Sequence, residues 1–437
     1  MTALAATDTY AAAFDSLTRE APVPDAVQAL RRVGFERFTS LGFPTTKNED
    51  WHYTSVSSIA DEEFTLLTAR TDDAQAGQLD PYYFRKEKWP TAVYVNGRFS
   101  PQLSSLTNLP KGVRLEVLAD SWKTSKTLAD QVGHVASTDN YAFTALNTAF
   151  MYDGALIEIA KDADIPGAIH LLYVTDATAA KGQMHPRTLI IAGKNSKATV
   201  VESYVSLSNA RYFTNAVTEV SVADGANLNH YKIQREGMRA FHVGTIEVRQ
   251  ARDSHYQSFS FAIGAELSRT NVYTTLDGAN CGATLNGLYM IGGAQHCDHQ
   301  TQIIHAQPNC FSRELYKGIL DGRSHGVFNG KVYVHPIAQK TDGKQTNKTL
   351  LLSDQAKADT KPQLEIFADD VKCTHGATIG QIDQQALFYM KSRGVNSETA
   401  TKLLTYAFAA DVLETIQLEP LKHELERLTL ERFTAAE

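Results

Sequence analysis

The sequence predicts a mainly β protein whose core is a β-solenoid or a large β-sandwich, with helical regions at both ends. Between about residues 155 and 380, short β-branched runs alternate with turn residues. No helical pattern long enough for a βαβ crossover intervenes, which argues against a doubly wound parallel sheet. The turn clusters recur at spacings of about 25 residues or twice that, as expected of stacked coils, and this period favours the solenoid.

Two sets of segments carry this pattern. The β-branched runs include Leu189–Ile191, Thr199–Val201, Val217–Val222, Thr245–Val248 and Lys331–Val334. The turn clusters begin at Asp224, Arg252, Asp277, Asp321 and Ala368.

Residues 1–90 are predicted to be mainly helical. Two helical stretches are expected, one from Asp8 to Glu20 and one from a cap at Asp25 to a stop at Gly42. The segment that follows, residues 42–54, is polar and aromatic and has neither a helical nor a strand period.

Residues 91–380 are predicted to form the β core. At its start, Asn96-Gly97 separates the strand-like runs Thr91–Val95 and Arg98-Phe99. An Asn-Gly pair between such runs is a strong signal for a two-residue hairpin.

Residues 381–437 are predicted to form a helical domain. Asp383 caps a helix that Gly394 ends, Ser397 opens a second helix, and Pro420 begins a third. A helical tail of about 55 residues is too small to bury much apolar area alone. We therefore expect it to dock on the β core or on a partner.

Composition limits the class of protein and its surroundings. The 437 residues are 43% hydrophobic and 21% charged, which is ordinary for a soluble globular protein of two or three domains. The net charge of −7 indicates no nucleic-acid-binding surface, and four cysteines are too few for a disulfide framework. No signal peptide and no apolar run of membrane-spanning length is seen. We expect a cytoplasmic protein with neither nucleic acid nor a membrane as partner.

The most informative motif places Cys373 and His375 two residues apart. In an extended strand such residues face the same side, with Cα atoms about 7 Å apart. Two ligands of one small metal ion sit closer than that, so a larger cluster, or a metal shared with a second chain, fits better. The structural alternative is a buried cysteine beside a hydrogen-bonded histidine.

The densest group of possible metal ligands is His296-Cys297-Asp298-His299, followed by His305 and Cys310. In a strand, His296 and Asp298 face one way while Cys297 and His299 face the other. The four ligands of a zinc site must point toward one position, and side chains that alternate between two faces do not do so. The pattern therefore favours buried, hydrogen-bonded structural residues.

Two further motifs are rejected as functional sites. Residues 326–332 resemble a phosphate loop, but Val332 stands where the Ser or Thr that holds magnesium is required. Asp369 and Asp370 are adjacent and point to opposite faces, so they are not an acid/base pair and fit a structural turn.

Several segments, taken together and in order, resemble the SufD family of scaffold subunits in the bacterial SUF system for iron–sulfur cluster assembly. They are Gly42–Trp51, Val327–Gly330, Lys340–Asp342 with Asn347, Asp359–Ile366, Asp369–Thr378, Ser392–Gly394 and Tyr406–Ala409. The segment Gly42–Trp51 is the reason for choosing SufD over the sister SufB family.

The resemblance implies a right-handed parallel β-helix core between the helical regions, and a non-enzymatic scaffold. It implies a SufB-type paralogous partner at the end of the β-helix, with Cys373 and His375 at that interface as cluster-assembly residues. It also implies a SufC-type ABC ATPase on the C-terminal helices, Asp383 to Phe433, for which Tyr406 and Phe408 are candidate contacts.

The number of ligands agrees with a shared site. Iron–sulfur clusters normally need about four ligands, and this chain offers one Cys and one His at its best site. We therefore expect a transient cluster in the complex and none in the isolated chain, which can be a monomer or a homodimer. Two other functions stay open: a β-helix carbohydrate-active enzyme, and a metal-storage protein that uses the ligands of residues 296–305.

Overall fold

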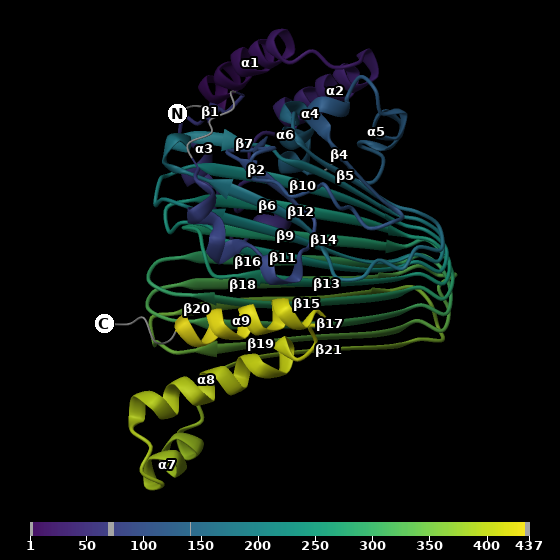
Figure 1. Ribbon diagram of the computed structural model, residues 1–437. Helices are drawn as coiled ribbons and strands as arrows, with labels where there is room; N and C mark the ends of the chain where they lie inside the picture. Colours follow the sequence, from purple (N-terminus) through teal and green to yellow (C-terminus); the bar gives the residue numbers. More distant parts are fainter. Residues whose placement is uncertain (1–2, 69–73, 140, 433–437) are drawn as a thin grey trace.

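The computed structural model describes residues 3–68, 74–139 and 141–432, and its centre is a parallel β-solenoid (Figure 1). Between residues 187 and 351, successive strands alternate between two facing sheets, and each pairs in parallel with the strand one coil earlier and one coil later. Phe241, for example, is the register partner of both Phe213 and Leu267. The predicted solenoid is confirmed and the sandwich is wrong; the right hand of the coil stays a prediction.

In the described residues the first sheet has eleven strands, of which nine form a continuous path from β20 to β4. Their bounds are β20 (Lys357–Ile366), β18 (His325–Val334), β16 (His296–His305), β14 (Leu267–Leu276), β12 (Phe241–Gln250), β10 (Phe213–Val222), β8 (Arg187–Ala192), β5 (Gly154–Ile159) and β4 (Val113–Val117). The short strand β7 (Gly182–Met184) pairs with β10, and β1 (Thr65–Leu66) pairs with β7.

The second sheet has ten strands in the same described ranges and runs from β21 to β3. Its strands are β21 (Lys372–Gln381), β19 (Asp342–Leu351), β17 (Phe311–Leu320), β15 (Gly282–Ile291), β13 (His255–Ala262), β11 (Asn227–Arg235), β9 (Lys197–Ser206), β6 (Ile169–Thr175), β2 (Thr91–Val95) and β3 (Arg98–Phe99). The β2–β3 pair is antiparallel around Asn96 and Gly97, which both have positive φ, so the predicted hairpin is confirmed.

The bends between strands explain the recurring turn residues. Gly225, Asp253 and Gly322 have φ values of 66°, 59° and 61°, a left-handed conformation that Gly and, less readily, Asp can adopt. Inside the coil, apolar side chains from both sheets meet in one core that includes Ile190, Val220, Val200 and Leu228. The strand alternation therefore places one set of side chains in the lumen and the other on the outer faces.

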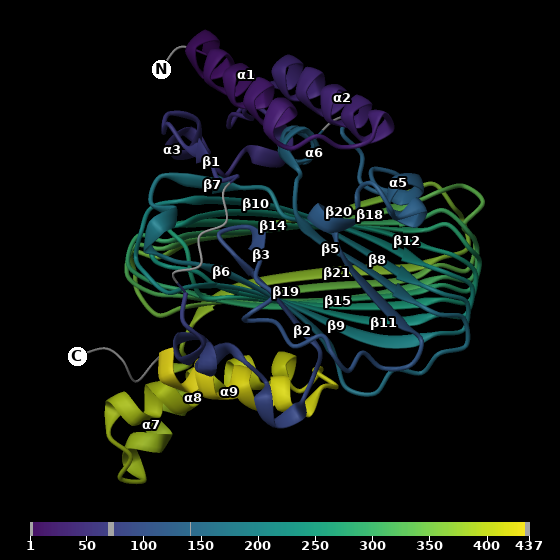
Figure 2. The same cartoon turned by 45° about the horizontal axis from the view of Figure 1, so that its top comes forward.

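The N-terminal helices cover the outer face of the first sheet (Figure 2). The longer ones are α1 (Ala3–Glu20), α2 (Asp25–Leu41) and α6 (Ala142–Phe150). Helices α2 and α6 approach closely at Gly34, where a Cβ would lie only 2.8 Å from the Ala149 nitrogen. Gly42 follows α2 with a φ of 64°, which confirms the predicted stop.

Shorter helical segments connect these parts of the chain. They are η1 (Glu49–Trp51), α3 (Ser57–Ala60), η2 (Ala76–Tyr82), η3 (Arg85–Glu87), α4 (Leu118–Ser121), α5 (Lys126–Gln131) and η4 (Ala177–Ala179). Helices α4, α5 and α6 therefore interrupt the β pattern between residues 117 and 154, inside the segment predicted as the β core. The division into domains stays a prediction.

Three C-terminal helices, α7 (Gln384–Ser392), α8 (Ser397–Leu413) and α9 (Glu419–Arg432), follow the last strand. The Asp383 side chain caps α7 as predicted, accepting a hydrogen bond from the Gln385 nitrogen. Leu413, Leu421 and Leu425 pack against the outer face of the second sheet, so the expected docking on the β core is confirmed for α9 and the end of α8. Helix α7 has no buried residue and extends away from the solenoid (Figure 1). Within the described ranges, no helix is long and apolar enough to span a membrane.

Candidate functional site

The solenoid ends in two strands that are each paired on one side only. Strand β20 pairs with β18 in the first sheet, and β21 pairs with β19 in the second. The residues of β20 are mostly half-buried and those of β21 mostly exposed, whereas the preceding strands are largely buried. This end of the coil therefore presents two strand edges and an uncovered lumen.

Cys373 and His375 occupy the second and fourth positions of β21, and their register partners on β19 are Gly343 and Gln345. Both partners are buried on the inner face of the coil, where Gln345 donates a 2.6 Å hydrogen bond to the Glu314 carboxyl. The predicted placement on one common face is therefore confirmed. That face is the one directed at the lumen, at its open end.

The two side chains have different surroundings. Cys373 is half-buried and packs beside Val332, Val334 and Ala338, and this burial raises the pKa of its thiol. The sulfur lies against Gly343, where a Cβ would be 3.4 Å from Sγ, an ordinary van der Waals distance. His375 is exposed. The imidazole is thus accessible to a partner, while the thiol must lose a proton before it can bind iron.

A polar column lies beneath His375. Glu314 on β17, Gln345 on β19 and His375 on β21 are successive register partners on the inner face. Burial raises the pKa of Glu314 to about 7. The hydroxyl of Thr360 on β20 is buried without a partner among the described atoms. The open end is therefore a polar cup with one exposed imidazole and one half-buried thiol.

Asp369 and Asp370 form the bend between β20 and β21. Asp370 makes an ion pair with Lys340, whose backbone nitrogen donates a 2.7 Å hydrogen bond to the Asp370 carbonyl. This confirms their interpretation as a structural turn that leads into Cys373.

The group around His296 divides between two faces as predicted. His296 Nε2 lies 2.9 Å from the Thr54 hydroxyl on the outer face, whereas Cys297 Sγ lies 3.7 Å from His299 Nδ1 in the lumen. His305 Nε2 contacts the Ser312 hydroxyl at 3.0 Å. In the part of the chain that the structure describes, no group of three or more His, Cys, Asp or Glu side chains is arranged to hold a metal ion.

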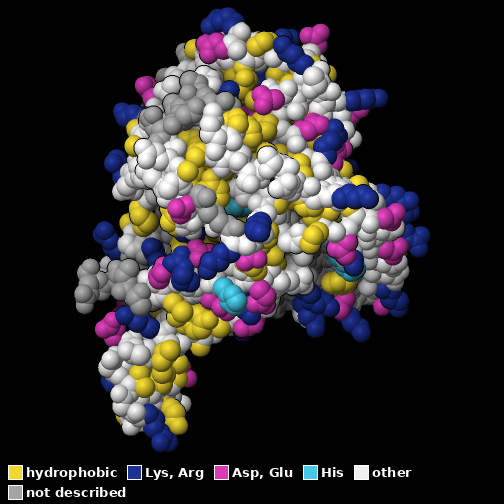
Figure 3. Space-filling view, viewed as in Figure 1, with side chains coloured by type: hydrophobic (Ala, Val, Ile, Leu, Met, Phe, Trp, Pro, Cys, Tyr) yellow, Lys and Arg dark blue, Asp and Glu magenta, His cyan; other side chains and the backbone are white. Residues whose placement is uncertain are grey.

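The helical arm formed by α7 and the first half of α8 carries exposed apolar side chains, seen at the lower left of Figure 3. Phe388, Tyr389 and Leu403 are 74%, 60% and 46% exposed. Of the residues predicted from sequence, Tyr406 is half-buried, and Phe408 packs under Lys317, whose Nζ donates a 2.6 Å hydrogen bond to the Phe408 carbonyl. Phe433 lies outside the described residues. Sequence reasoning missed Phe388 and Tyr389, although both stand in the helix that Asp383 opens.

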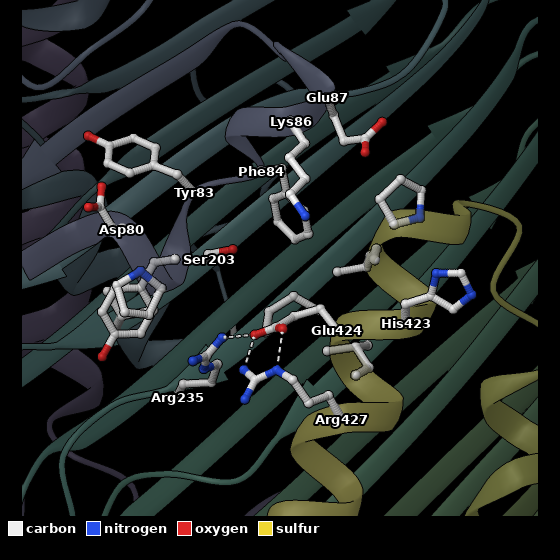
Figure 4. Close-up of a pocket in the computed structure, with 17 residues that line it drawn as sticks. Asp80, Tyr83, Phe84, Lys86, Glu87, Ser203, Arg235, His423, Glu424 and Arg427 are labelled. Carbon is white, nitrogen blue, oxygen red and sulfur yellow. Dashed lines mark hydrogen bonds and ion pairs between the residues drawn. The ribbon is translucent and has the colours of Figure 1, made fainter. Parts of the chain in front are cut away.

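A groove of about 520 Å³ lies between the segment of η2 and η3 and helix α9 (Figure 4). On its floor, Glu424 Oε1 lies 3.0 Å from Arg235 Nη1, and Glu424 Oε2 accepts a 2.9 Å hydrogen bond from Arg427 Nε. This groove lies over β9 and β11, several strands away from β21. It is therefore separate from the Cys373–His375 end.

Comparison with known proteins gives matches along most of the chain. Residues 5–171 match the family described as "SufBD protein N-terminal region", and residues 173–408 match "SUF system FeS cluster assembly, SufBD core domain". The chain is 34% identical over 408 residues to the iron–sulfur cluster assembly protein SufD of Escherichia coli, covering 92% of this chain and 91% of that protein.

Two further relatives give similar coverage. An iron–sulfur cluster assembly SufBD family protein of Synechocystis sp. is 33% identical over 400 residues, 88% of this chain and 86% of the relative. SufD of Bacillus subtilis is 25% identical over 417 residues, 92% of this chain and 93% of the relative. With these matches over a parallel β-solenoid flanked by helices, the chain belongs to the SufBD family of SUF-system iron–sulfur cluster assembly proteins.

Proposed function

We propose that this chain is a SufD-type scaffold subunit that carries out no chemistry of its own and supplies part of a site on which iron–sulfur clusters are built. The observation that carries the proposal is the placement of Cys373 and His375 together on the inner face of the last strand, at an uncovered end of the solenoid. A ligand pair at an open end is suited to a site completed by a second chain.

The number of ligands supports a cluster site that two chains share. A cluster takes about four protein ligands, mostly thiolates, and this end supplies one thiol and one imidazole. The missing ligands would come from a SufB-type paralogue whose own solenoid abuts the edges of β20 and β21. Unpaired strand edges are ready templates for pairing with another chain. The same edges would allow a homodimer when the paralogue is absent.

The exposed aromatic side chains of the helical arm support the proposal of a second partner. Phe388 and Tyr389 are neighbours on α7 and are largely exposed, and none of the described residues of α7 is buried. Exposed aromatic clusters of this kind mark protein interaction sites. We assign the arm to a SufC-type ATPase, with Tyr406 and Phe408 positioning α8 rather than forming the centre of the contact. ATP would then be hydrolysed by the partner, in the cytoplasm.

The two other functions are less well supported. A storage site built from His296, Cys297 and His299 would need these side chains on one face, whereas they lie on two. A carbohydrate-active enzyme would need a groove with paired carboxylates, and Asp369 and Asp370 are held in a structural turn.

The test is anaerobic cluster assembly on the complex co-expressed with SufB-type and SufC-type subunits. We expect His375→Ala and Cys373→Ser to abolish cluster formation, while Thr374→Ala, on the outer face of the same strand, assembles clusters normally. His375→Ala should change the free energy of unfolding by no more than about 0.5 kcal/mol, because the side chain is exposed. A stable His375→Ala complex that builds clusters at the normal rate would show that the motif is structural.

A further inference from the structure

Two of the four cysteines, Cys281 and Cys310, occupy equivalent positions in successive coils. Each follows an asparagine with positive φ (63° at Asn280 and 61° at Asn309) and directly precedes a strand of the second sheet. The two following residues, Gly282 and Phe311, are register partners, and the Phe311 nitrogen donates a 3.0 Å hydrogen bond to the Cys281 carbonyl. The two cysteines are therefore stacked neighbours at one corner of the coil.

This corner is filled by small side chains along the solenoid. The buried residues at the same position, from β9 to β19, are Ser196, Ala226, Ser254, Cys281, Cys310 and Thr341. Filling the corner requires only a small side chain, as Ser196 and Ala226 show. The simplest interpretation of the two cysteines is therefore packing alone, and it does not account for how their sulfur atoms are arranged.

The two thiols are in side-chain contact and share an acceptor. Cys281 Sγ lies 3.1 Å, and Cys310 Sγ 3.3 Å, from the carbonyl oxygen of Gly278. Cys281 Sγ also lies 3.0 Å from the Ala251 carbonyl oxygen. Neighbouring parallel strands are about 4.8 Å apart, which is within the Cα separations of about 4.4–6.8 Å that disulfides span.

The contact between the two thiols also shifts their pKa values in opposite directions. The Cys310 thiol lowers the pKa of Cys281 to about 7, and the same contact raises the pKa of Cys310. A thiol with a lowered pKa is partly ionised near neutral pH and is the better nucleophile. Cys297 has the opposite character, because burial raises its pKa to about 12.

Cys281 and Cys310 lie nearer the surface of the coil than Cys297 does, although all three side chains are at most 1% exposed. Both cysteines are buried, but each is one residue from an exposed bend residue, Asn280 or Asn309. Cys297 is buried among other side chains, beside Tyr289 and Leu320. The corner thus combines a thiol of lowered pKa, a neighbouring thiol and a position one residue from an exposed bend.

We propose that Cys281 and Cys310 form an oxidisable dithiol that a peroxide converts into a disulfide linking two successive coils. The Cys281 thiolate attacks one oxygen of hydrogen peroxide, the O–O bond breaks, and hydroxide leaves, which gives a sulfenic acid. The Cys310 sulfur then attacks the Cys281 sulfur, and the sulfenic hydroxyl leaves as water with the Cys310 proton. The two sulfurs lose two electrons in total, and one peroxide becomes two waters once the released hydroxide takes up the proton that Cys281 had lost.

The test uses the full-length reduced chain, one equivalent of hydrogen peroxide, alkylation in denaturant and peptide mass spectrometry. We expect a 281–310 disulfide with the loss of two alkylatable thiols, while Cys297 stays alkylatable. In Cys310→Ser, we expect Cys281 to accumulate as a sulfenic acid that dimedone traps. Cys281→Ser should slow the oxidation of Cys310 at least tenfold.

The wild-type chain alone decides the proposal if either serine variant fails to fold. A folded wild-type chain in which both thiols remain alkylatable after peroxide treatment would overturn the proposal. Oxidation of Cys281 to sulfinic acid without a link to Cys310 would overturn it as well.

Discussion

The hydroxyl of Thr54 donates a 2.6 Å hydrogen bond to Oδ2 of Asp298, a residue 244 positions later in the chain. The same carboxylate oxygen accepts a 2.7 Å hydrogen bond from Arg269, whose guanidinium lies 3.6 Å from the centre of the Trp51 ring. Arg269 also donates a hydrogen bond to the Asp50 carbonyl. The polar and aromatic segment 42–54, which has no regular period, is thus fixed to the outer face of the first sheet.

Thr54→Val should loosen this segment. The valine keeps the shape but leaves Asp298 with one hydrogen bond fewer, a change worth about 1–3 kcal/mol for a charged acceptor. We expect a lower free energy of unfolding in urea and faster proteolysis within residues 42–54. Ser55→Ala is the control, because Ser55 is exposed and, among the described residues, its side chain bonds only to the side chain and backbone nitrogen of the nearby Ser57. Equal stability of Thr54→Val and wild type would contradict this role.

Much of the architecture could be predicted from local sequence. The hairpin at Asn96-Gly97, the cap at Asp383 and the common face of Cys373 and His375 depend only on residues close in the chain. Turn chemistry and strand alternation, which are short-range properties, are sufficient to predict each of them.

The charged lumen could not be predicted in this way. Lys232 Nζ lies 2.8 Å from His242 Nε2, and His242 Nδ1 lies 2.7 Å from Glu236, all of them buried. A lysine in a strand usually faces solvent, and only the folding of β11 onto β12 brings these three side chains together. The bond between Thr54 and Asp298 was missed for the same reason, because no local pattern pairs residues so far apart.

The ion pair between Arg187 and Glu219 should contribute strongly to stability. Both side chains are at most 2% exposed, and Arg187 Nη2 lies 2.6 Å from Glu219 Oε1. Glu219→Gln would leave the guanidinium buried without a counter-charge, at a cost of about 3–5 kcal/mol. Arg249→Gln, which removes an exposed pair to Asp277, should cost less than about 1 kcal/mol. Urea unfolding measures the free energy of unfolding of both variants. Similar losses of stability in the two would contradict the larger contribution of the buried pair.

Glu314 should make stability depend on pH. Burial raises its pKa from 4.5 to about 7 in the folded chain, so the folded state binds more protons than the unfolded state between these values. The free energy of unfolding must then fall as pH rises from about 4.5 through about 7, by about 3 kcal/mol from this group. Glu314→Gln removes the titration and should flatten this part of the profile. Parallel stability profiles for variant and wild type would show that Glu314 does not titrate in this range.

The isolated chain should hold no stable iron–sulfur cluster after anaerobic reconstitution. Cys373 and His375 supply two of about four ligands, and burial raises the pKa of the Cys373 thiol, which disfavours the thiolate that binds iron. Iron and sulfide analysis, with the ultraviolet–visible spectrum, should show only background levels, and adding the SufB-type and SufC-type subunits should restore the chromophore. Stoichiometric iron and sulfide bound to the chain alone would contradict a shared site.

The ATPase assignment is best tested by substitution on α7 instead of by truncation. Removing residues 383–437 would uncover apolar side chains of the second sheet, among them Phe259 and Leu288, which α8 and α9 cover. Such a truncation would therefore confuse lost binding with lost stability.

Replacing both Phe388 and Tyr389 by Ser avoids this problem. Both side chains are more than half exposed, so the free energy of unfolding should change by no more than about 0.5 kcal/mol per residue. Removing two aromatic contacts should weaken ATPase binding at least about 30-fold, the equivalent of about 2 kcal/mol. Titration calorimetry measures the affinity, with Met238→Ser as the control, because it removes an exposed apolar side chain from the bend between β11 and β12. If the double variant binds the ATPase as tightly as Met238→Ser does, the exposed aromatic pair on α7 serves another partner.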